Sequence, residues 1–353
     1  MREQSLNFLK ALVATASPSG YEKDIGLLYR EYVEPFADEV AVDALGNVTA
    51  VINPKAPMKI MLAAHMDEIG FMVHYISDDG FLHFSSVGGN DSAIAAGQRV
   101  WVHGCTRVAG VIGTKAMHLQ TLDEQNKKPL LKNLWIDIGA RSRTQAEELV
   151  SVGDVVTSQA ELQPLVGDRA VGRAFDNKAG VLIVAEAMRL LHEDGGLDPE
   201  VGVYGVATVQ EEIGSRGATT AAFDIKPQTA VAVDMGQALD IPNLLKPEYG
   251  EFDLGRGPGI PRGANTNRAV FNLLVGAAKD SQIPYQVNAS PSSSPTDARV
   301  LQISRAGVAA GLLEVPLRYM HSPSEVLSLT DVEDCSRLMA AYCRSVKPDS
   351  SFI

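Results

Sequence analysis

The sequence predicts an α/β protein with a β-rich segment inserted into it. Three observations support this fold class. Apolar strand-like runs alternate with helical patterns up to about Gly70, and again from about Ala170 to the end of the chain. Met58–Ala64 is an uninterrupted apolar run, as expected of a strand that is covered on both faces. Between these two parts, short alternating segments are separated by Gly, Asp and Asn turns, a pattern typical of a sandwich or barrel.

The first α/β part begins with two predicted helices. Residues 4–16 carry apolar side chains at helical spacing. After a turn at 17–20, Ser19 and Glu22 match a capping box and predict the start of a second helix. Glu39–Asp43 and Val48–Ile52 predict a hairpin, which leads into the apolar strand.

The inserted segment is predicted to be all β. Its strands are expected at Phe71–Ile76, Phe81–Phe84, Arg99–Val102, Val108–Ile112 and Val155–Thr157. We therefore expect residues 1–70 and 165–353 to form one α/β domain, and residues 71–164 to form a second, β-rich domain within it.

The second α/β part contains two further helical patterns. Asn177–Leu191 has apolar residues at helical spacing. Near the C-terminus, Thr330 and Glu333 match another capping box and predict the start of the last helix.

The bulk composition excludes several classes of protein. With 45% hydrophobic and 21% charged residues, the chain has the composition of a globular protein with a large core. A net charge of -12 argues against nucleic acid as the main partner, because phosphate binding needs clustered Lys and Arg. The 3 cysteines are too few for a disulfide framework. No apolar run approaches the roughly 20 residues of a membrane span, so we expect a cytoplasmic enzyme without a membrane partner.

Possible metal ligands appear where hydrophobic segments end or a helix begins. In chain order these are His65 with Asp67, Asp176, the pair Glu211-Glu212, Asp234 and His321. Open α/β sheets place their ligands at the carboxyl ends of the strands, so these groups can converge although they are far apart in sequence. Two histidines and several carboxylates at one edge suit a pair of divalent cations, zinc or cobalt, and such a pair indicates hydrolysis.

The adjacent glutamates predict two different roles. Neighbouring side chains diverge along a strand, so Glu211 and Glu212 are not expected to face each other across a sugar as in a glycosidase. One can hold a metal ion while the other reaches the activated water. Asp67 is two residues after His65 and is expected on the same side of the chain, where it can hydrogen-bond the second imidazole nitrogen.

Four segments together resemble the tetrahedral aminopeptidases, a family of deblocking and glutamyl aminopeptidases within the clan of dinuclear zinc peptidases. They are 65–73 (HMDEIGFMV), 174–180 (AFDNKAG), 210–217 (QEEIGSRG) and 315–323 (VPLRYMHSP). The similar segment at 18–22 (PSGYE) adds to the likeness, which runs through nearly the whole chain in order.

The resemblance implies a mixed-sheet, three-layer zinc-peptidase domain with an inserted dimerisation domain. It implies metal-binding roles for His65, Asp176, Glu212, Asp234 and His321, with Asp176 bridging the two ions. It also implies Glu211 as the general base, and Asp67 as the carboxylate that supports the metal ligand His65. Peptides with a free N-terminus are the implied substrates, and a hollow tetrahedral dodecamer built from dimers is the implied assembly. The chain departs from the family pattern at Asn177, where many relatives have Asp, and at Lys178, where Arg is frequent.

Other activities remain open at this stage. A two-metal carboxypeptidase or amide deacylase would use the same ligand pattern, and only the recognition of the substrate terminus would differ. A glycoside hydrolase finds little support, since only Trp101 and Trp135 are available as tryptophan stacking platforms for a sugar and both lie in the inserted segment. A non-enzymatic assembly protein with a vestigial site would not need the intact ligand set.

Overall fold

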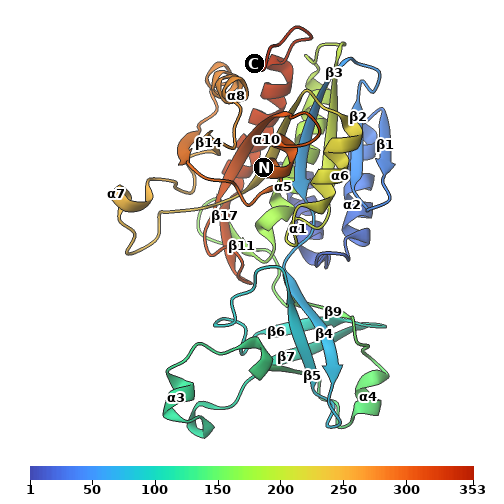
Figure 1. The fold of residues 1–353 in the computed structure, drawn as a ribbon, viewed down its shortest axis with the longest axis vertical. Helices are drawn as coiled ribbons and strands as arrows, with labels where there is room; N and C mark the ends of the chain where they lie inside the picture. Colours follow the sequence, from blue (N-terminus) through green and yellow to red (C-terminus); the bar gives the residue numbers. More distant parts are fainter. The chain divides into compact units, whose positions relative to one another are not determined.

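The computed structural model describes residues 1–353, apart from the side chain of Glu124. The chain divides into two compact units. The first unit comprises Met1–Asp67, Glu161–Met320 and Glu325–Ile353, and the second comprises Glu68–Ala160 and His321–Ser324. Both units are drawn in Figure 1.

The centre of the first unit is a mixed sheet. Within the described residues it has 8 strands, in the order β1 (Glu39–Val42), β2 (Val48–Ile52), β12 (Val201–Thr208), β3 (Met58–His65), β13 (Thr229–Gln237), β16 (Ala309–Leu317), β14 (Gly259–Gly263) and β15 (Gln286–Ser290). The four central strands, β12, β3, β13 and β16, are parallel. Their carboxyl ends therefore meet at one edge of the sheet, where ligands bind in open α/β folds.

Helices cover both faces of this sheet, which gives three layers (Figure 1). One face packs against helices whose apolar side chains share a core with Ile60 and Leu62 of β3: α1 (Glu3–Ala14), α2 (Lys23–Val33), α5 (Phe175–Asp194), α8 (Arg268–Asp280) and α10 (Leu329–Ser345). The other face packs Met61 and Ala63 against α6 (Arg216–Ile225) and α9 (Asp297–Gln302). Because β3 is covered on both sides, its sequence is continuously apolar.

Shorter elements complete the first unit. They are the 3-10 turn η1 (Glu34–Phe36), helix α7 (Lys246–Tyr249), and a small antiparallel sheet of β10 (Gln163–Pro164), β11 (Arg169–Gly172) and β17 (Glu325–Ser328).

The second unit is a closed barrel, with strands in the order β4 (Gly70–Ile76), β5 (Leu82–Val87), β8 (Trp135–Asp137), β7 (Arg107–Gly113), β6 (Arg99–His103) and β9 (Val155–Ser158). Helices α3 (Leu122–Gln125) and α4 (Arg143–Glu147) and the turns η2 (Met117–Leu119) and η3 (Leu131–Asn133) lie in its connections. Inward side chains such as Phe71, Phe84 and Val102 fill the barrel. The predicted fold class, a mixed α/β sheet protein with an inserted β-barrel, is confirmed, although strand β8 was not predicted.

Both predicted capping boxes are wrong. Helix α2 begins at Lys23 without a side-chain cap. Ser19 instead donates to Asp67, and Glu22 accepts from the main-chain N–H groups of Gly20 and Gln210. Tertiary hydrogen bonds thus replace the local pairing. Helix α10 is capped by Ser328, whose hydroxyl accepts from the N–H of Asp331.

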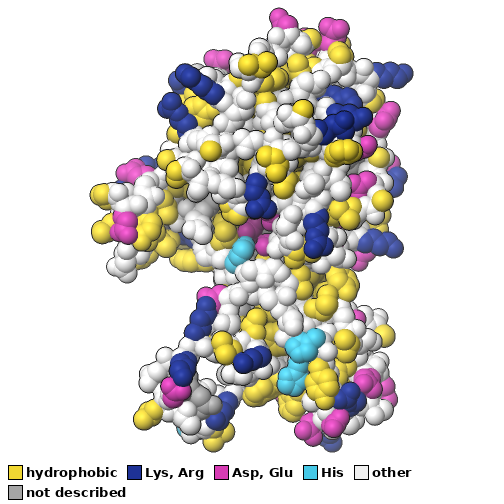
Figure 2. Space-filling view, viewed as in Figure 1, with side chains coloured by type: hydrophobic (Ala, Val, Ile, Leu, Met, Phe, Trp, Pro, Cys, Tyr) yellow, Lys and Arg dark blue, Asp and Glu magenta, His cyan; other side chains and the backbone are white. Residues whose placement is uncertain are grey.

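Two further observations bear on possible partners. None of the helices in the described part of the chain has the length and hydropathy needed to cross a membrane. On the face drawn in Figure 2, the described Lys and Arg side chains are scattered among Asp and Glu side chains and form no continuous basic stripe. The expectation that nucleic acid is not the main partner stays a prediction from the net charge.

Candidate metal centre

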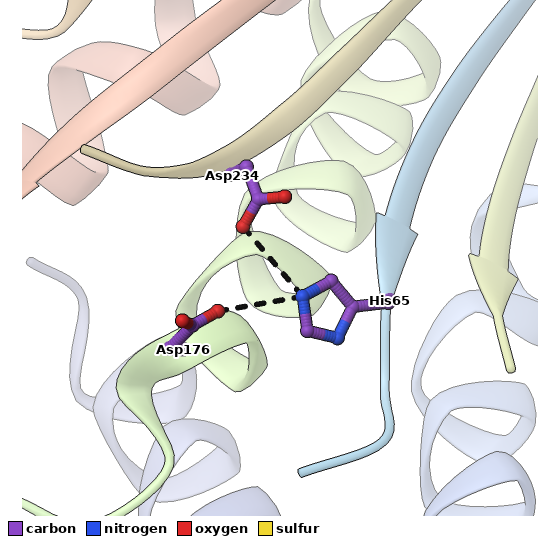
Figure 3. Close-up of side chains that lie close together, drawn as sticks. All are labelled: His65, Asp176 and Asp234. Atoms are coloured by element: carbon purple, nitrogen blue, oxygen red, sulfur yellow. Dashed lines mark ion pairs between the residues drawn. The ribbon is translucent and has the colours of Figure 1, made fainter. Parts of the chain in front are cut away.

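His65 lies at the centre of a buried group of acidic side chains at the carboxyl edge of the sheet. It is the last residue of β3, and its side chain is 2% exposed. Its Nε2 lies 3.3 Å from Asp176 Oδ1 and 3.6 Å from Asp234 Oδ1 (Figure 3). Possible ligand atoms of all three residues lie within 4.8 Å of one another. The structure therefore brings together three of the five predicted ligands around one point.

Asp234 reaches this point from inside a strand. The sequence analysis expects Asp234 where a hydrophobic segment ends, but β13 continues beyond it to Gln237. Asp234 Oδ1 also accepts a hydrogen bond of 2.8 Å from the N–H of Met235. A carboxylate is tolerated within this strand because the Asp234 side chain lies at the carboxyl edge of the sheet, where the imidazole of His65 faces it.

Asp176 lies in the first turn of α5. The backbone angles of Asp176 and Asn177 are not helical, and the regular part of the helix follows this pair. The main-chain N–H of Asp176 donates to Glu325 Oε2 at 3.1 Å. This leaves the Asp176 carboxylate facing the site, where one of its oxygens lies within 4.8 Å of a carboxylate oxygen of Glu212. Asp176 is thus shared between the group around His65 and the pair with Glu212.

Asp67 organises the segment that carries the two glutamates. Its Oδ1 accepts from the N–H of Glu211 at 2.9 Å, and its Oδ2 accepts from the N–H of Glu212 at 3.2 Å and from the Ser19 hydroxyl at 2.6 Å. The nearest acceptor to His65 Nδ1 is the main-chain oxygen of Asp67 at 3.1 Å, with Asp67 Oδ1 at 3.4 Å. Asp67 therefore contacts the imidazole through both its backbone and its carboxylate, and the carboxylate also holds the chain at Glu211 and Glu212.

Glu211 faces the same imidazole. Its Oε2 lies 3.9 Å from His65 Nε2, and its Oε1 accepts from the Ser215 hydroxyl at 3.1 Å. The two glutamates follow β12 after Val209 and Gln210, so they lie in a turn beyond the strand end.

The electrostatics of the group favour a cation. Burial, together with the neighbouring carboxylates, raises the pKa of Glu211 to about 7. Burial also raises the pKa of Asp234 to about 6, although His65 opposes the shift. Burial acts to lower the pKa of His65, but Asp234, Asp176 and Asp67 raise it well above its usual value. These shifts arise because buried negative charges lie close together without enough positive charge between them.

His321 lies outside the first unit. Strand β16 ends at Leu317, so His321 lies in the loop that follows and not directly at the end of the strand. The segment His321–Ser324 packs with the second unit, and a Cβ atom on Gly89 would lie 3.2 Å from His321 Nδ1. His321 has a φ of 60°, a backbone conformation that side chains with a Cβ rarely adopt. Its role as a ligand remains a prediction from the sequence.

Comparison with known proteins decides the family. A family model described as M42 glutamyl aminopeptidase matches residues 46–338. The chain belongs to this family. The lysyl aminopeptidase of Pyrococcus furiosus is 36% identical over 348 residues, which cover 96% of this chain and 97% of that protein. The predicted resemblance to the tetrahedral aminopeptidases is confirmed at the level of the family.

Solved structures match this M42 chain over nearly its full length. An aminopeptidase from the archaeon Desulfurococcus kamchatkensis is 36% identical, with a TM-score of 0.91 and coverage of 98% of this chain and 96% of that one. The TET1 peptidase of Pyrococcus horikoshii is 31% identical, with a TM-score of 0.84 and coverage of 96% and 98%. That peptidase is described as assembling into a tetrahedron or a large octahedral shell.

Two buried acids next to the M42 site were not singled out from the sequence. Glu325 is 2% exposed and accepts from Asp176, as described above. Asp297, at the start of α9, is also 2% exposed. Its Oδ2 accepts from the Thr208 hydroxyl at 2.6 Å, and its Oδ1 has no partner among the described residues. A Thr-Asp pair that begins a helix looks like an ordinary cap in sequence, so nothing local distinguishes Asp297.

Asp297 is expected to make the metal-free protein less stable as the pH rises. Burial and the charge of Glu211 raise its pKa from 3.8 to about 7. Between these values the folded state binds more protons than the unfolded state, so the free energy of unfolding falls as pH increases through this window. Asp297→Asn should therefore raise the Tm of the metal-free protein by a few degrees at about pH 8, and by a smaller amount at about pH 5.5, where only part of the stability has been lost.

Thermal unfolding in a chelator at the two pH values measures this effect. Asp224→Asn, an exposed carboxylate at the end of α6, is the matched control and should show no such dependence. Equal shifts for Asp297→Asn at both pH values would mean that the side chain acts through packing and not through its charge.

Proposed function

We propose that this M42 chain is a metal-dependent aminopeptidase that removes N-terminal residues from peptides. The observation that carries the proposal is the meeting of His65, Asp176 and Asp234 at the carboxyl edge of the sheet. Membership of the M42 family supports the reaction class. The names of relatives differ in the residue removed, glutamyl in one and lysyl in another, so the family does not specify the preferred substrate.

The donor set suits two divalent cations. Imidazole nitrogen and carboxylate oxygen are ligands of both zinc and cobalt. In this proposal, the two ions would be held by His65, Asp176, Glu212, Asp234 and His321, with Asp176 shared between them. The buried carboxylates repel one another in the metal-free protein, and cations would offset that repulsion. Bound ions supply Lewis acidity that polarises a carbonyl and acidifies water.

Glu211 is proposed as the general base. Its carboxylate accepts the proton of the attacking water and returns it to the leaving amine. The Ser215 hydroxyl holds one oxygen, and the other oxygen faces the site. Asp67 positions Glu211 by accepting from its main-chain N–H.

We also propose that residues 71–164 form a dimerisation domain inserted into the catalytic domain, residues 1–70 and 165–353, and that dimers assemble into a tetrahedral dodecamer. The description of the related Pyrococcus horikoshii peptidase supports the assembly.

A chelate-and-restore assay tests the function. Aminoacyl p-nitroanilides present a free amino terminus, and N-acetylated amino acids and N-blocked peptides serve as the parallel substrates. Activity on the free-amino substrates should fall to background after metal removal and return with zinc or cobalt. Cleavage of only the blocked substrates would instead indicate a deacylase or carboxypeptidase, and activity that survives complete metal removal would exclude the proposed chemistry.

A further inference from the structure

Glu314 lies directly beside the proposed ligand Asp234. The two residues are register partners on the neighbouring parallel strands β16 and β13. Adjacent strands are about 4.8 Å apart, and partners in a parallel pair point to the same face. Ala232 and Leu312, two residues before Asp234 and Glu314, both belong to the core beneath α6 and α9. Asp234 and Glu314 therefore emerge on the same face, at the same edge of the sheet.

The Glu314 carboxylate has no cation to balance it. Asn288 Nδ2 donates to its Oε2 at 2.5 Å. Burial raises the pKa of Glu314, and the bond from Asn288 opposes this shift only in part. Among the described residues, no Lys or Arg pairs with it. Glu314 is half-buried, and a carboxylate partly withdrawn from water without a positive partner carries a cost in free energy. A cation on a ligand would therefore be stabilised here.

An aromatic ring stands next to this carboxylate. Gly236 follows Asp234 by two residues, and a Cβ atom there would lie 2.5 Å from Phe252 Cε1 and 3.3 Å from Glu314 Oε2. A Cβ atom on Gly259 would lie 2.8 Å from Phe252 Cε2. The two glycines thus allow Phe252 to approach the sheet beside Glu314. Phe252 is 2% exposed, so its ring is an apolar neighbour that limits the access of water to the carboxylate.

We propose that Glu314 is a specificity-determining residue that favours substrates whose N-terminal side chain is cationic, Lys or Arg. This inference rests on the proposed aminopeptidase function. In this proposal, the amino terminus of the substrate lies at the metal centre beside Asp234. The side chain of the substrate's N-terminal residue is then within reach of β16, the strand next to β13. The four-carbon stem of lysine places its ammonium roughly 6 Å from Cα, a little more than one strand spacing. Lysine is therefore long enough to bring its charge to Glu314.

Lysyl and norleucyl p-nitroanilides test the proposal in the wild-type protein. The two substrates share the same four-carbon side chain and differ in the terminal ammonium. We expect kcat/KM to be at least about tenfold higher for the lysyl substrate, since a half-buried carboxylate without a charged partner is stabilised by a cation. The ratio should decline as ionic strength rises. Equal kcat/KM values would overturn the assignment of Glu314, whereas no cleavage of either substrate would argue against the aminopeptidase itself.

Glu314→Gln removes the charge and keeps the shape. The lysyl-to-norleucyl ratio should fall by about tenfold or more, and Glu314→Asp should retain most of it. Glu200→Gln, the same chemical change at the exposed amino end of β12, is the matched control and should leave the ratio as in the wild type. If the folded Glu314→Gln protein keeps the wild-type lysyl-to-norleucyl ratio of kcat/KM, Glu314 does not determine specificity.

A binding measurement separates recognition from turnover. Lysinol and norleucinol carry no scissile bond, so calorimetry on the metal-loaded protein reports their affinity alone. Lysinol should bind the wild type about tenfold more tightly than norleucinol, and Glu314→Gln should reduce this difference. Equal affinities in the wild type would contradict the proposal even if the rates differed.

Discussion

Replacing Glu211 with Gln is expected to lower kcat by about 10²–10⁴-fold on free-amino substrates while the metal content stays full. The amide has nearly the shape of the carboxylate, and its oxygen can still accept from the Ser215 hydroxyl, which lies 3.1 Å from Glu211 Oε1. The main-chain bond from Glu211 to Asp67 does not involve the side chain and should persist. The amide cannot accept the proton of the attacking water, so the loss should appear in kcat.

Elemental analysis and steady-state kinetics on the same preparation measure both quantities. Glu200→Gln is again the matched control, because this exposed residue lies at the opposite end of β12. A Glu211→Gln protein with wild-type kcat would refute the base assignment. A protein that had also lost its metal would place Glu211 among the ligands.

Replacing Asp234 with Asn is expected to have opposite effects on the metal-loaded and metal-free proteins. In the metal-loaded protein the neutral amide is a weaker ligand, so metal content, activity and Tm should all fall. In the metal-free protein the substitution removes one of several like charges from a buried group, so Tm should rise. The Asn side chain can still accept from the N–H of Met235, as Asp234 does at 2.8 Å.

The sign of the metal-free effect follows from the pKa of Asp234. Burial raises it from 3.8 to about 6. The folded state therefore binds more protons than the unfolded state between these values, and the stability contributed by the protonated form is lost as pH rises through the window. The increase in the Tm of the metal-free protein caused by Asp234→Asn should thus be largest above about pH 6 and small near about pH 4.

Thermal unfolding with chelator and with added zinc tests both halves of this prediction. Asp224→Asn, which changes an exposed aspartate in α6, should leave the Tm unchanged both with chelator and with zinc. A lower Tm for Asp234→Asn in the chelated protein would show that the carboxylate stabilises the fold by a route other than metal binding.

The hydrophobic patterns were sufficient to predict the layers of the fold. The apolar run at 58–64 corresponds to β3, and the alternating segments after Gly70 correspond to strands of the barrel. These patterns record which faces are buried, and burial is what selects helix or strand. Strand β8 was not predicted because its three residues are too short to show alternation.

The predictions that failed depended on contacts between distant residues. Glu22 looks like half of a capping box, yet it binds the N–H of Gln210. The spacing of Asp67 after His65 likewise does not reveal that its carboxylate also accepts from the N–H groups of Glu211 and Glu212. Sequence spacing describes neighbours along the chain and cannot report a hydrogen bond to a residue more than a hundred positions away.

The amino-acid sequence by itself determined which chemical groups this chain brings to an edge of its sheet, because each candidate follows an apolar segment or begins a helix whose place is dictated by burial. Only the tertiary structure decided how those groups meet. The register of β13 against β16 sets Glu314 beside Asp234, and the packing of α9 sets Asp297 against Thr208. Register and helix docking are properties of strands and helices packed together, so no single segment contains them.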